Sequence, residues 1–325
     1  MSSINDTHSA AALLLFEDGE PRGHVSEIQR VRMLSAAIEA IKENGYARLT
    51  VAQIISRAKV SRKTFYDLFE DREDCFLAVF EATLDQLGAR IASAYGSERS
   101  WREGVRTGLA AALSFIDEDP ELARLCVVDA LGGGVRVLSE RARAIATVHK
   151  VVDLGREAPT AKPGIPSVTA EGVVGAVLAV LHTRLLERSV ESYVELHGSL
   201  MSMIVLPYLG TRAASRELAR PAPRLPAQKP GEHPVAVDPM AGLDMRLTYR
   251  TVRVLAAIRE RPSASNREVA DGAGIADQGQ ISKLLARLEG LGLIENVDRD
   301  QNKGVPNEWR LTTRGERVER ATRPM

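Results

Sequence analysis

Basic and hydroxyl side chains stand together at the start of a short predicted helix near the N-terminus. The helix opens with four polar residues: Ser61, Arg62, Lys63 and Thr64. Ser61 is at the position that caps such a helix, and the N-terminal end of a recognition helix is the end that contacts base edges in DNA. Guanidinium and ammonium groups there can donate to guanine O6 and N7 or to phosphate oxygens. These residues therefore predict binding to duplex DNA.

Three predicted helices would position this basic end. The first starts at Ser26, with Gln29 as the second member of a capping box, and stops at Asn44-Gly45. Thr50 caps the second helix, and Arg72 begins the helix that follows the basic one. Because backbone N–H groups at helix N-termini attract phosphate, Thr50 and Arg72 are candidate phosphate contacts.

This unit resembles the DNA-binding domain of the TetR family of bacterial transcriptional regulators. The residues that carry the resemblance are Gly45, Tyr46, Thr50, Val51, Ile54, Ala58, Val60, Ser61, Thr64, Phe65, Tyr66, Phe69, Arg72 and Phe76. The resemblance implies phosphate contacts for Thr50, Tyr66 and Arg72, and a helical domain downstream that dimerises and senses a ligand. Asp67-Leu68 departs from the family pattern, because a carboxylate at position 67 would repel phosphate. The other interpretation is an ordinary helical hairpin with a solvated basic face.

A second unit near the C-terminus has the order helix, helix, helix, hairpin, helix. Ser265 and Glu268 predict one capping box, Asp277 with Gln280 caps the third helix, and Thr313 caps the last. The stretch from Leu293 to Leu311 alternates as two strands around a polar turn over 300–306. The order is that of a winged helix and resembles modules of the MarR type.

The exposed side of the third helix in this unit offers a possible second DNA-binding surface. Its residues are Asp277, Gln278, Gln280, Ser282 and Lys283, joined by Asn302 and Lys303 at the tip of the wing. Residues 240–325 hold 15 Lys or Arg against 12 Asp or Glu, which is a weak positive excess. Because winged helices also serve as protein-interaction modules, DNA and protein both stay open as partners.

Between the two units, the predicted helices are rich in small and aliphatic residues that could surround an apolar cavity for a small effector. Polar groups near their apolar faces are candidates to orient it: Arg124, Asp129, His149 and His182. A filled core, with these residues at the surface or rim, is the alternative. The apolar helices near 168–190 and 199–218 are expected to form a homodimer interface, as the resemblance implies.

The composition fits a helical protein of two or three domains. Hydrophobic residues make up 44% of the 325 residues and aromatic residues only 4%, a pairing that favours aliphatic helix packing. The net charge is zero, which argues against a wholly basic nucleic-acid binder. Cys75 and Cys126 form no CxxC pair and indicate reduced thiols in the cytoplasm. No signal peptide is expected, and Val173–Leu186 is too short and too polar for a membrane span.

Motifs for catalysis, cofactors and metals are missing from the sequence. The glycines at 132–134 lack the Gly-Lys-Ser/Thr continuation of a phosphate loop, and no HExxH, GxSxG or Cys/His metal spacing occurs. We therefore expect neither an enzyme nor a cofactor or metal protein.

The sequence predicts a mainly α protein with five segments. They are a flexible arm over 1–25, a helix-turn-helix domain over 26–71, a helical dimerisation and ligand domain over 72–219, a proline-rich linker over 220–240 and a winged helix with a two-stranded wing over 241–325. The predicted function is that of a ligand-responsive repressor that binds a palindromic operator as a homodimer. The alternative is a dimeric regulatory scaffold whose winged helix binds a protein and whose middle domain holds no ligand.

Overall fold

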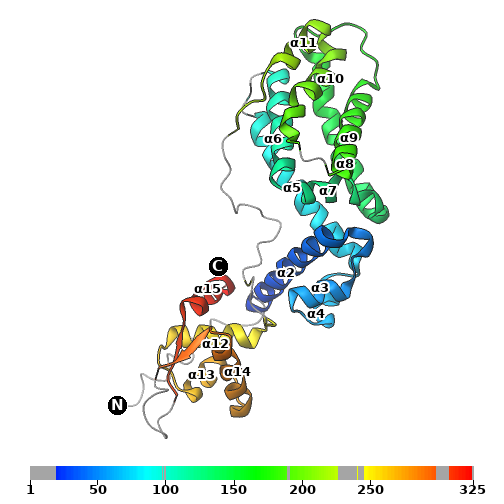
Figure 1. Ribbon diagram of the computed structural model, residues 1–325. Coiled ribbons are helices and arrows are strands. Elements are labelled where there is room, and N and C mark those ends of the chain that lie inside the picture. The colour runs from blue at the N-terminus through cyan, green and yellow to red at the C-terminus, as the bar shows by residue number, and fades with distance from the viewer. Residues whose placement is uncertain are drawn as a thin grey trace. The chain divides into compact units, whose positions relative to one another are not determined.

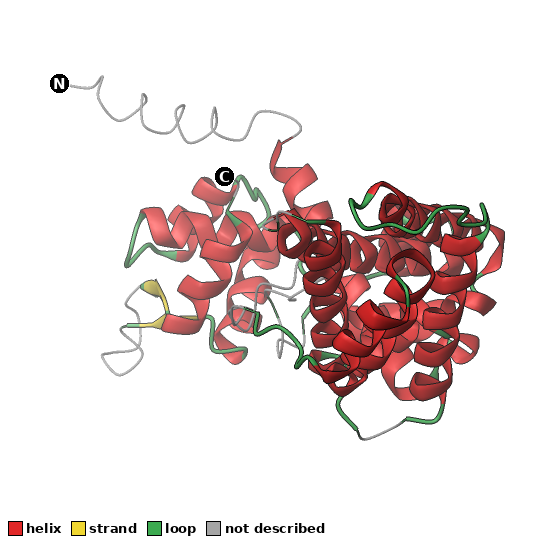
Figure 2. Cartoon of the chain, turned by 90° about the horizontal axis from the view of Figure 1, so that it is seen from above, coloured by secondary structure: helices red, strands yellow, loops and turns green. Residues whose placement is uncertain are grey.

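The computed structural model describes residues 20–96, 98, 100–188, 191–225, 240, 245–297 and 307–323 (Figure 1). These residues are mainly helical, with a two-stranded sheet near the C-terminus (Figure 2). The chain forms two compact units. One holds the described residues of 1–35, 55–68 and 236–325, and the other those of 36–54 and 69–235. The predicted domain boundaries stay predictions.

The first described helix is α2, Glu20–Asn44, which starts earlier than predicted. The predicted start at Ser26 is wrong, and Gln29 makes no cap there, because its Nε2 donates to the carbonyl oxygen of Leu247 at 2.9 Å. Gln29 therefore lies inside the helix and contacts a distant segment of the chain. The predicted stop is confirmed: α2 ends before Gly45, whose φ of 75° suits glycine.

Three short elements follow: η1, Tyr46–Arg48; α3, Val51–Ala58; and α4, Arg62–Leu68. Thr50 and Gln53 cap α3 reciprocally, with the Gln53 amide donating to Thr50 Oγ1 at 3.2 Å and the Thr50 amide donating to Gln53 Oε1 at 2.8 Å. Lys59 turns the chain with a φ of 52°, and the Val60 amide donates to the carbonyl of Ile55 at 3.2 Å. This six-to-one bond closes the end of α3.

The second compact unit, which we call the helical unit, continues from α5, Arg72–Gly96, through a series of helices that end at Ala219. They are α6, Trp101–Glu118; α7, Pro120–Val127; η2, Asp129–Gly132; α8, Gly134–Asp153; η3, Leu154–Glu157; α9, Thr169–Leu186; η4, Tyr193–Leu196; α10, His197–Leu209; and α11, Thr211–Ala219. Asp119 caps α7 by accepting from the Leu122 amide, as its position before Pro120 predicts. The single helix predicted over 199–218 is wrong, because Gly210, with a φ of 84°, separates α10 from α11.

A buried ionic cluster fastens α11 to α6. Glu217 on α11 is fully buried and accepts hydrogen bonds from Arg106 Nη1 at 2.6 Å and Arg102 Nε at 2.6 Å. Arg106 also donates to the carbonyl of Pro221, and its own carbonyl lies 2.9 Å from Nε2 of the buried His197. Glu217 and Arg106 are buried and Arg102 is partly exposed, so the two guanidinium groups compensate the buried carboxylate and fix the position of α11 on α6.

The described residues of the C-terminal part form four helices and an antiparallel strand pair. The elements are α12, Tyr249–Glu260; α13, Asn266–Ala273; α14, Gln278–Gly290; β1, Ile294–Asn296; β2, Trp309–Leu311; and α15, Thr313–Thr322. Ile294 pairs with Leu311 and Asn296 with Trp309. The capping box of Ser265 with Glu268 is confirmed, whereas α15 is capped by Thr312 rather than by Thr313. The predicted wing tip, with Asn302 and Lys303, lies outside the described residues.

Candidate nucleic-acid interface

The helix α4 has a buried apolar side and an exposed polar side, as its sequence predicts. Phe65 is fully buried, while Arg62, Lys63 and Tyr66 are exposed. Ser61 Oγ accepts from the Thr64 amide at 3.0 Å, which caps the helix and orders its first turn. Two cationic side chains therefore stand free of the core at the N-terminal end of a capped helix.

An intrahelical ion pair engages one of these cations. Lys63 Nζ lies 2.8 Å from Oδ2 and 3.0 Å from Oδ1 of Asp67, one helical turn along. Both side chains are exposed, at 83% for Lys63 and 55% for Asp67. An exposed pair of this kind contributes only about 0.3–0.5 kcal/mol, so Lys63 can leave Asp67 at a small free-energy cost. Asp67, which departs from the family pattern, would therefore compete with DNA for the ammonium group of Lys63.

The candidate phosphate contacts Thr50 and Arg72 are exposed at the N-termini of α3 and α5. Arg72 also makes contacts within the protein that the sequence did not predict. Its Nη1 donates to the carbonyl of Leu49 at 2.8 Å, and its guanidinium lies 5.4 Å from the centroid of the Tyr46 ring. The side chain therefore holds the backbone just before Thr50, and four of its five N–H donors are not used by that bond.

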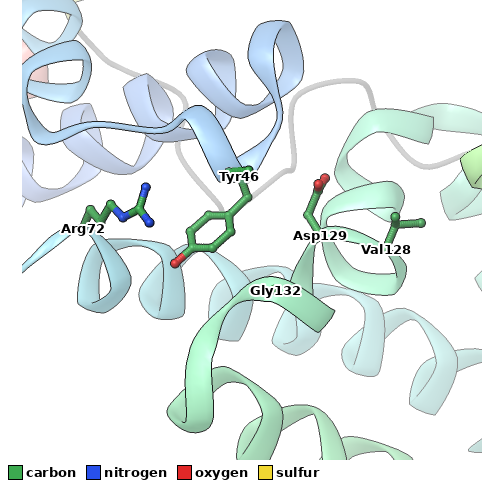
Figure 3. Close-up of a pocket in the computed structure, with 6 residues that line it drawn as sticks. Tyr46, Arg72, Val128, Asp129 and Gly132 are labelled. Atoms are coloured by element: carbon green, nitrogen blue, oxygen red, sulfur yellow. The ribbon is translucent and has the colours of Figure 1, made fainter.

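Tyr46 joins η1 to the helical unit. Its ring centroid lies 4.0 Å from that of Phe76 on α5, and its backbone N–H donates to the carboxylate of Asp129 in η2. Burial raises the pKa of Asp129, and Arg124 and the Tyr46 amide oppose this shift. Figure 3 shows Tyr46 between Arg72 and Asp129. The turn that precedes α3 is thereby bonded to two elements of the helical unit.

A cavity of about 350 Å³ opens at this junction (Figure 3). Its lining comprises Tyr46, Ala47, Arg72, Val128, Asp129 and Gly132. Of the four residues predicted to orient an effector, only Asp129 lines this cavity, and Arg124 Nη2 lies 4.0 Å from Oδ1 of Asp129. His149 on α8 and His182 on α9 are half-buried and do not line it. The structure thus brings two of the four together.

The predicted residues of the second DNA-binding surface are all exposed at the cap and in the first turns of α14, whereas Ile281 and Leu285 of the same helix are buried. The exposed residues are Asp277, Gln278, Gln280, Ser282 and Lys283. Asp277 is bound as the cap, accepting from the amides of Gly279 and Gln280 at 2.8 Å and 3.0 Å, which lowers the pKa of its carboxyl.

An amide network ties α14 to the strands. Asn266 Nδ2 lies 3.4 Å from Ser282 Oγ, and Asn266 Oδ1 accepts from the indole N–H of Trp309 at 2.6 Å. Nothing in the sequence pattern indicated Asn266, because its partners are 16 and 43 residues away. It orients α14 relative to β2.

A further exposed surface runs along α9 and α10. On α9 the exposed face carries small residues: Gly172, Gly175, Ala179 and Thr183. On α10, Met203 and Leu206 are exposed at 36% and 42%. The helix α9 has a mean hydropathy of 1.3, yet only 28% of it is buried. By length and composition it could cross a membrane, and one such helix is weak evidence for that role.

The N-terminal part of the chain is similar in sequence to known bacterial regulators. Residues 33–79 match the family model of bacterial regulatory proteins of the tetR family. The HTH-type transcriptional activator FasR of Mycolicibacterium smegmatis is 29% identical over 97 residues, covering 30% of this chain and 44% of that protein. The fatty acid metabolism regulator protein of Bacillus subtilis is 27% identical over 93 residues, covering 29% and 48%. The chain spans about half the length of these curated relatives.

One solved structure adds to the evidence on the fold. SmeT, the repressor of the Stenotrophomonas maltophilia multidrug efflux pump SmeDEF, superimposes with a TM-score of 0.50 and 18% identity. The likeness covers 62% of this chain and 97% of SmeT, and at this identity it shows the fold alone. Residues 33–79 are thus similar to the DNA-binding segment of the tetR family, and the helical fold is similar to that of SmeT.

Proposed function

We propose that this protein is a sequence-specific DNA-binding transcriptional regulator that binds a palindromic operator as a homodimer. The observation that carries the proposal is the N-terminal end of α4, where Arg62 and Lys63 are exposed on a helix capped by Ser61. This end lies inside the segment that matches the tetR family. Helices presented in this way enter the major groove with their N-terminal residues toward the bases.

The residues divide into two roles. Ser61, Arg62, Lys63 and Thr64 are proposed to face base edges and the adjoining backbone. Thr50, Tyr66 and Arg72 are proposed to contact phosphate. Tyr66 is 52% exposed although it is aromatic, which suits a hydroxyl that reaches outward. Arg72 would combine a phosphate contact with its bond to the Leu49 carbonyl, so that DNA binding and the position of α3 depend on one side chain.

The homodimer is proposed to form through α9 and α10, which pack against each other and leave an apolar face uncovered. Met203 and Leu206 protrude from α10, and the small residues of α9 leave space for such side chains. Two copies related by a twofold axis would then bury each face against the other. A dimer also explains a palindromic operator, because two recognition helices about 34–36 Å apart read successive major-groove turns.

The helical unit is proposed to bind a small apolar effector that weakens operator binding. The link from η2 to η1 through Asp129 and Tyr46 supports the proposal, because a shift of η2 would move the turn before α3. A coupling of about 1–3 kcal/mol would change operator affinity roughly 5–150-fold. This arrangement would make the protein a repressor. FasR is named an activator, so a reporter gene under the operator decides the sign.

The C-terminal part is proposed to be a winged helix in which α14 supplies a second DNA-binding surface. The exposed polar residues of α14 and the antiparallel pair of β1 and β2 support this assignment. The weak positive excess of the segment leaves a protein partner as the alternative.

The experiment that tests the proposed function is selection of bound fragments from genomic DNA by the full chain. Expected are fragments that share a palindrome and bind two chains each. Lys63→Ala should enrich these fragments more weakly and with a relaxed preference at one position, while Lys150→Ala, which removes an exposed cation from α8, should enrich them as the wild type does. If the wild-type chain enriches no common sequence, or Lys63→Ala enriches the same one equally well, the proposed function is wrong.

A further inference from the structure

The N-terminal part of α2 precedes the segment that matches the tetR family. The match begins at residue 33, whereas α2 begins at Glu20. On this extension, Val25, Ile28, Gln29 and Arg32 follow the spacing i, i+3, i+4, i+7, which places them on one face of the helix. We call this stripe the α2 docking face. Val25, Ile28 and Arg32 on it are buried, so another part of the protein covers it.

The covering part is the beginning of the C-terminal module. Met245 and Leu247 are each 2% exposed and belong to the same apolar cluster as Val25 and Ile28. The cluster continues into Val254 and other core residues of the module, such as Leu255 and Leu285. The apolar contact is therefore continuous with the core of the module itself.

Two polar bonds set the register of this contact. Arg32 Nη1 donates to the carbonyl of Met245 at 3.2 Å, and Gln29 Nε2 donates to the carbonyl of Leu247 at 2.9 Å. Two donors one helical turn apart thus match alternate carbonyls of a non-helical chain segment. Losing either side chain would leave a carbonyl without this donor in an apolar environment, which is unfavourable. The pairing favours one alignment of the module along α2.

The segment that contacts the α2 docking face, Met245 to Leu247, lies directly before α12. Thr248, the residue after Leu247, caps α12 by accepting from the Thr251 amide at 3.2 Å. No flexible residues therefore separate the docked segment from the first helix of the module. The exposed residues of α14, including Gln278 and Lys283, are outside the docking contact.

We propose that the α2 docking face is an intramolecular binding site for the C-terminal module, and that it makes α14 a second DNA-reading element at a fixed spacing from α4. The inference rests on the proposed function. A module held only by a linker would accept second sites at many distances. A module held on α2 accepts one distance only. Because each chain of the dimer carries one module, the operator would consist of a palindromic core with a flanking element on each side, both at the same distance from the core.

The test compares three full-length proteins: the wild type, Val25→Asp and Glu27→Ala. Val25→Asp places a carboxylate in the docking cluster, and Glu27→Ala alters an exposed position of the same helix as a matched control. Each protein selects operators from random duplexes. The wild type and Glu27→Ala should select the core plus a flanking element at one distance, whereas Val25→Asp should select the core with no constant flanking element.

Hydrogen exchange provides a readout that does not depend on DNA. Backbone amides of 25–32 and 249–258 should exchange about tenfold faster in Val25→Asp than in the wild type, because burial of a valine side chain contributes at least that factor. Equal exchange rates in the two proteins would overturn the docking site. A wild type that selects the core without a flanking element would overturn the fixed second reader. Failure of all three proteins to select any core would instead refute the proposed function.

Discussion

Replacing Asp67 with asparagine is expected to tighten operator binding. In the free protein Asp67 holds Lys63 at 2.8 Å, so Lys63 must leave this pair before it contacts DNA. The pair is exposed and spans one helical turn, and pairs of this kind contribute about 0.3–0.5 kcal/mol. Removing the competitor should therefore raise the affinity about twofold for each chain and about fourfold for a dimer. Loss of the repulsion between the carboxylate and phosphate acts in the same direction.

Fluorescence anisotropy of a labelled operator duplex at several salt concentrations measures this gain. The salt dependence also tells what Lys63 contacts. If Lys63 turns to a phosphate, the slope of log affinity against log salt should steepen by up to about 0.9 per chain. If it turns to a base edge, the slope should stay the same while the affinity still rises.

The matched control is Asp85→Asn. Asp85 is an exposed aspartate on α5, outside the candidate nucleic-acid interface, and the change alters the net charge of the chain by the same amount. Asp85→Asn should leave operator affinity almost unchanged. If Asp67→Asn bound the operator no more tightly than Asp85→Asn, or more weakly than the wild type, Asp67 would not compete with DNA for Lys63.

Three further outcomes are expected. Lys63→Ala should cost about 1–3 kcal/mol on the best operator and relax the preference at one position, whereas Arg72→Ala should weaken all sequences about equally and flatten the salt dependence; uniform losses for both, measured on operator variants, would exclude base reading by Lys63. Glu217→Ala should lower the free energy of unfolding in urea by about 3–5 kcal/mol, because Arg106 would stay buried without its carboxylate; a loss below about 1 kcal/mol would contradict this role for the cluster. Burial lowers the pKa of His197 below its ordinary 6.5, so the unfolded chain binds the extra proton first and the free energy of unfolding should fall as the pH drops below 6.5. His197→Gln should show a shallower fall in urea titrations over this range, and an unchanged slope would assign the pH dependence to other groups.

The sequence by itself determined the starts of α3, α4 and α13 and the polar end of α4. Thr50 with Gln53, Ser61 with Thr64, and Ser265 with Glu268 each form a cap between residues three apart. Such bonds are made within one turn and need no distant partner, so the residue types alone indicate them. The same holds for the buried and exposed sides of α14, which follow from its apolar spacing.

Tertiary structure decided what those elements contact. The sequence placed Arg72 at a helix start but could not show its bond to Leu49, 23 residues earlier, nor the position of Tyr46 between α5 and η2. It also predicted a tethered C-terminal module and a helix that starts at Ser26. The helix begins at Glu20 instead, and Gln29 and Arg32 bond to carbonyls more than 200 residues away, at the start of the C-terminal module. Contacts of this kind depend on which surfaces pack together in the folded chain, and the residue pattern of one helix does not predict its partners that are distant in sequence.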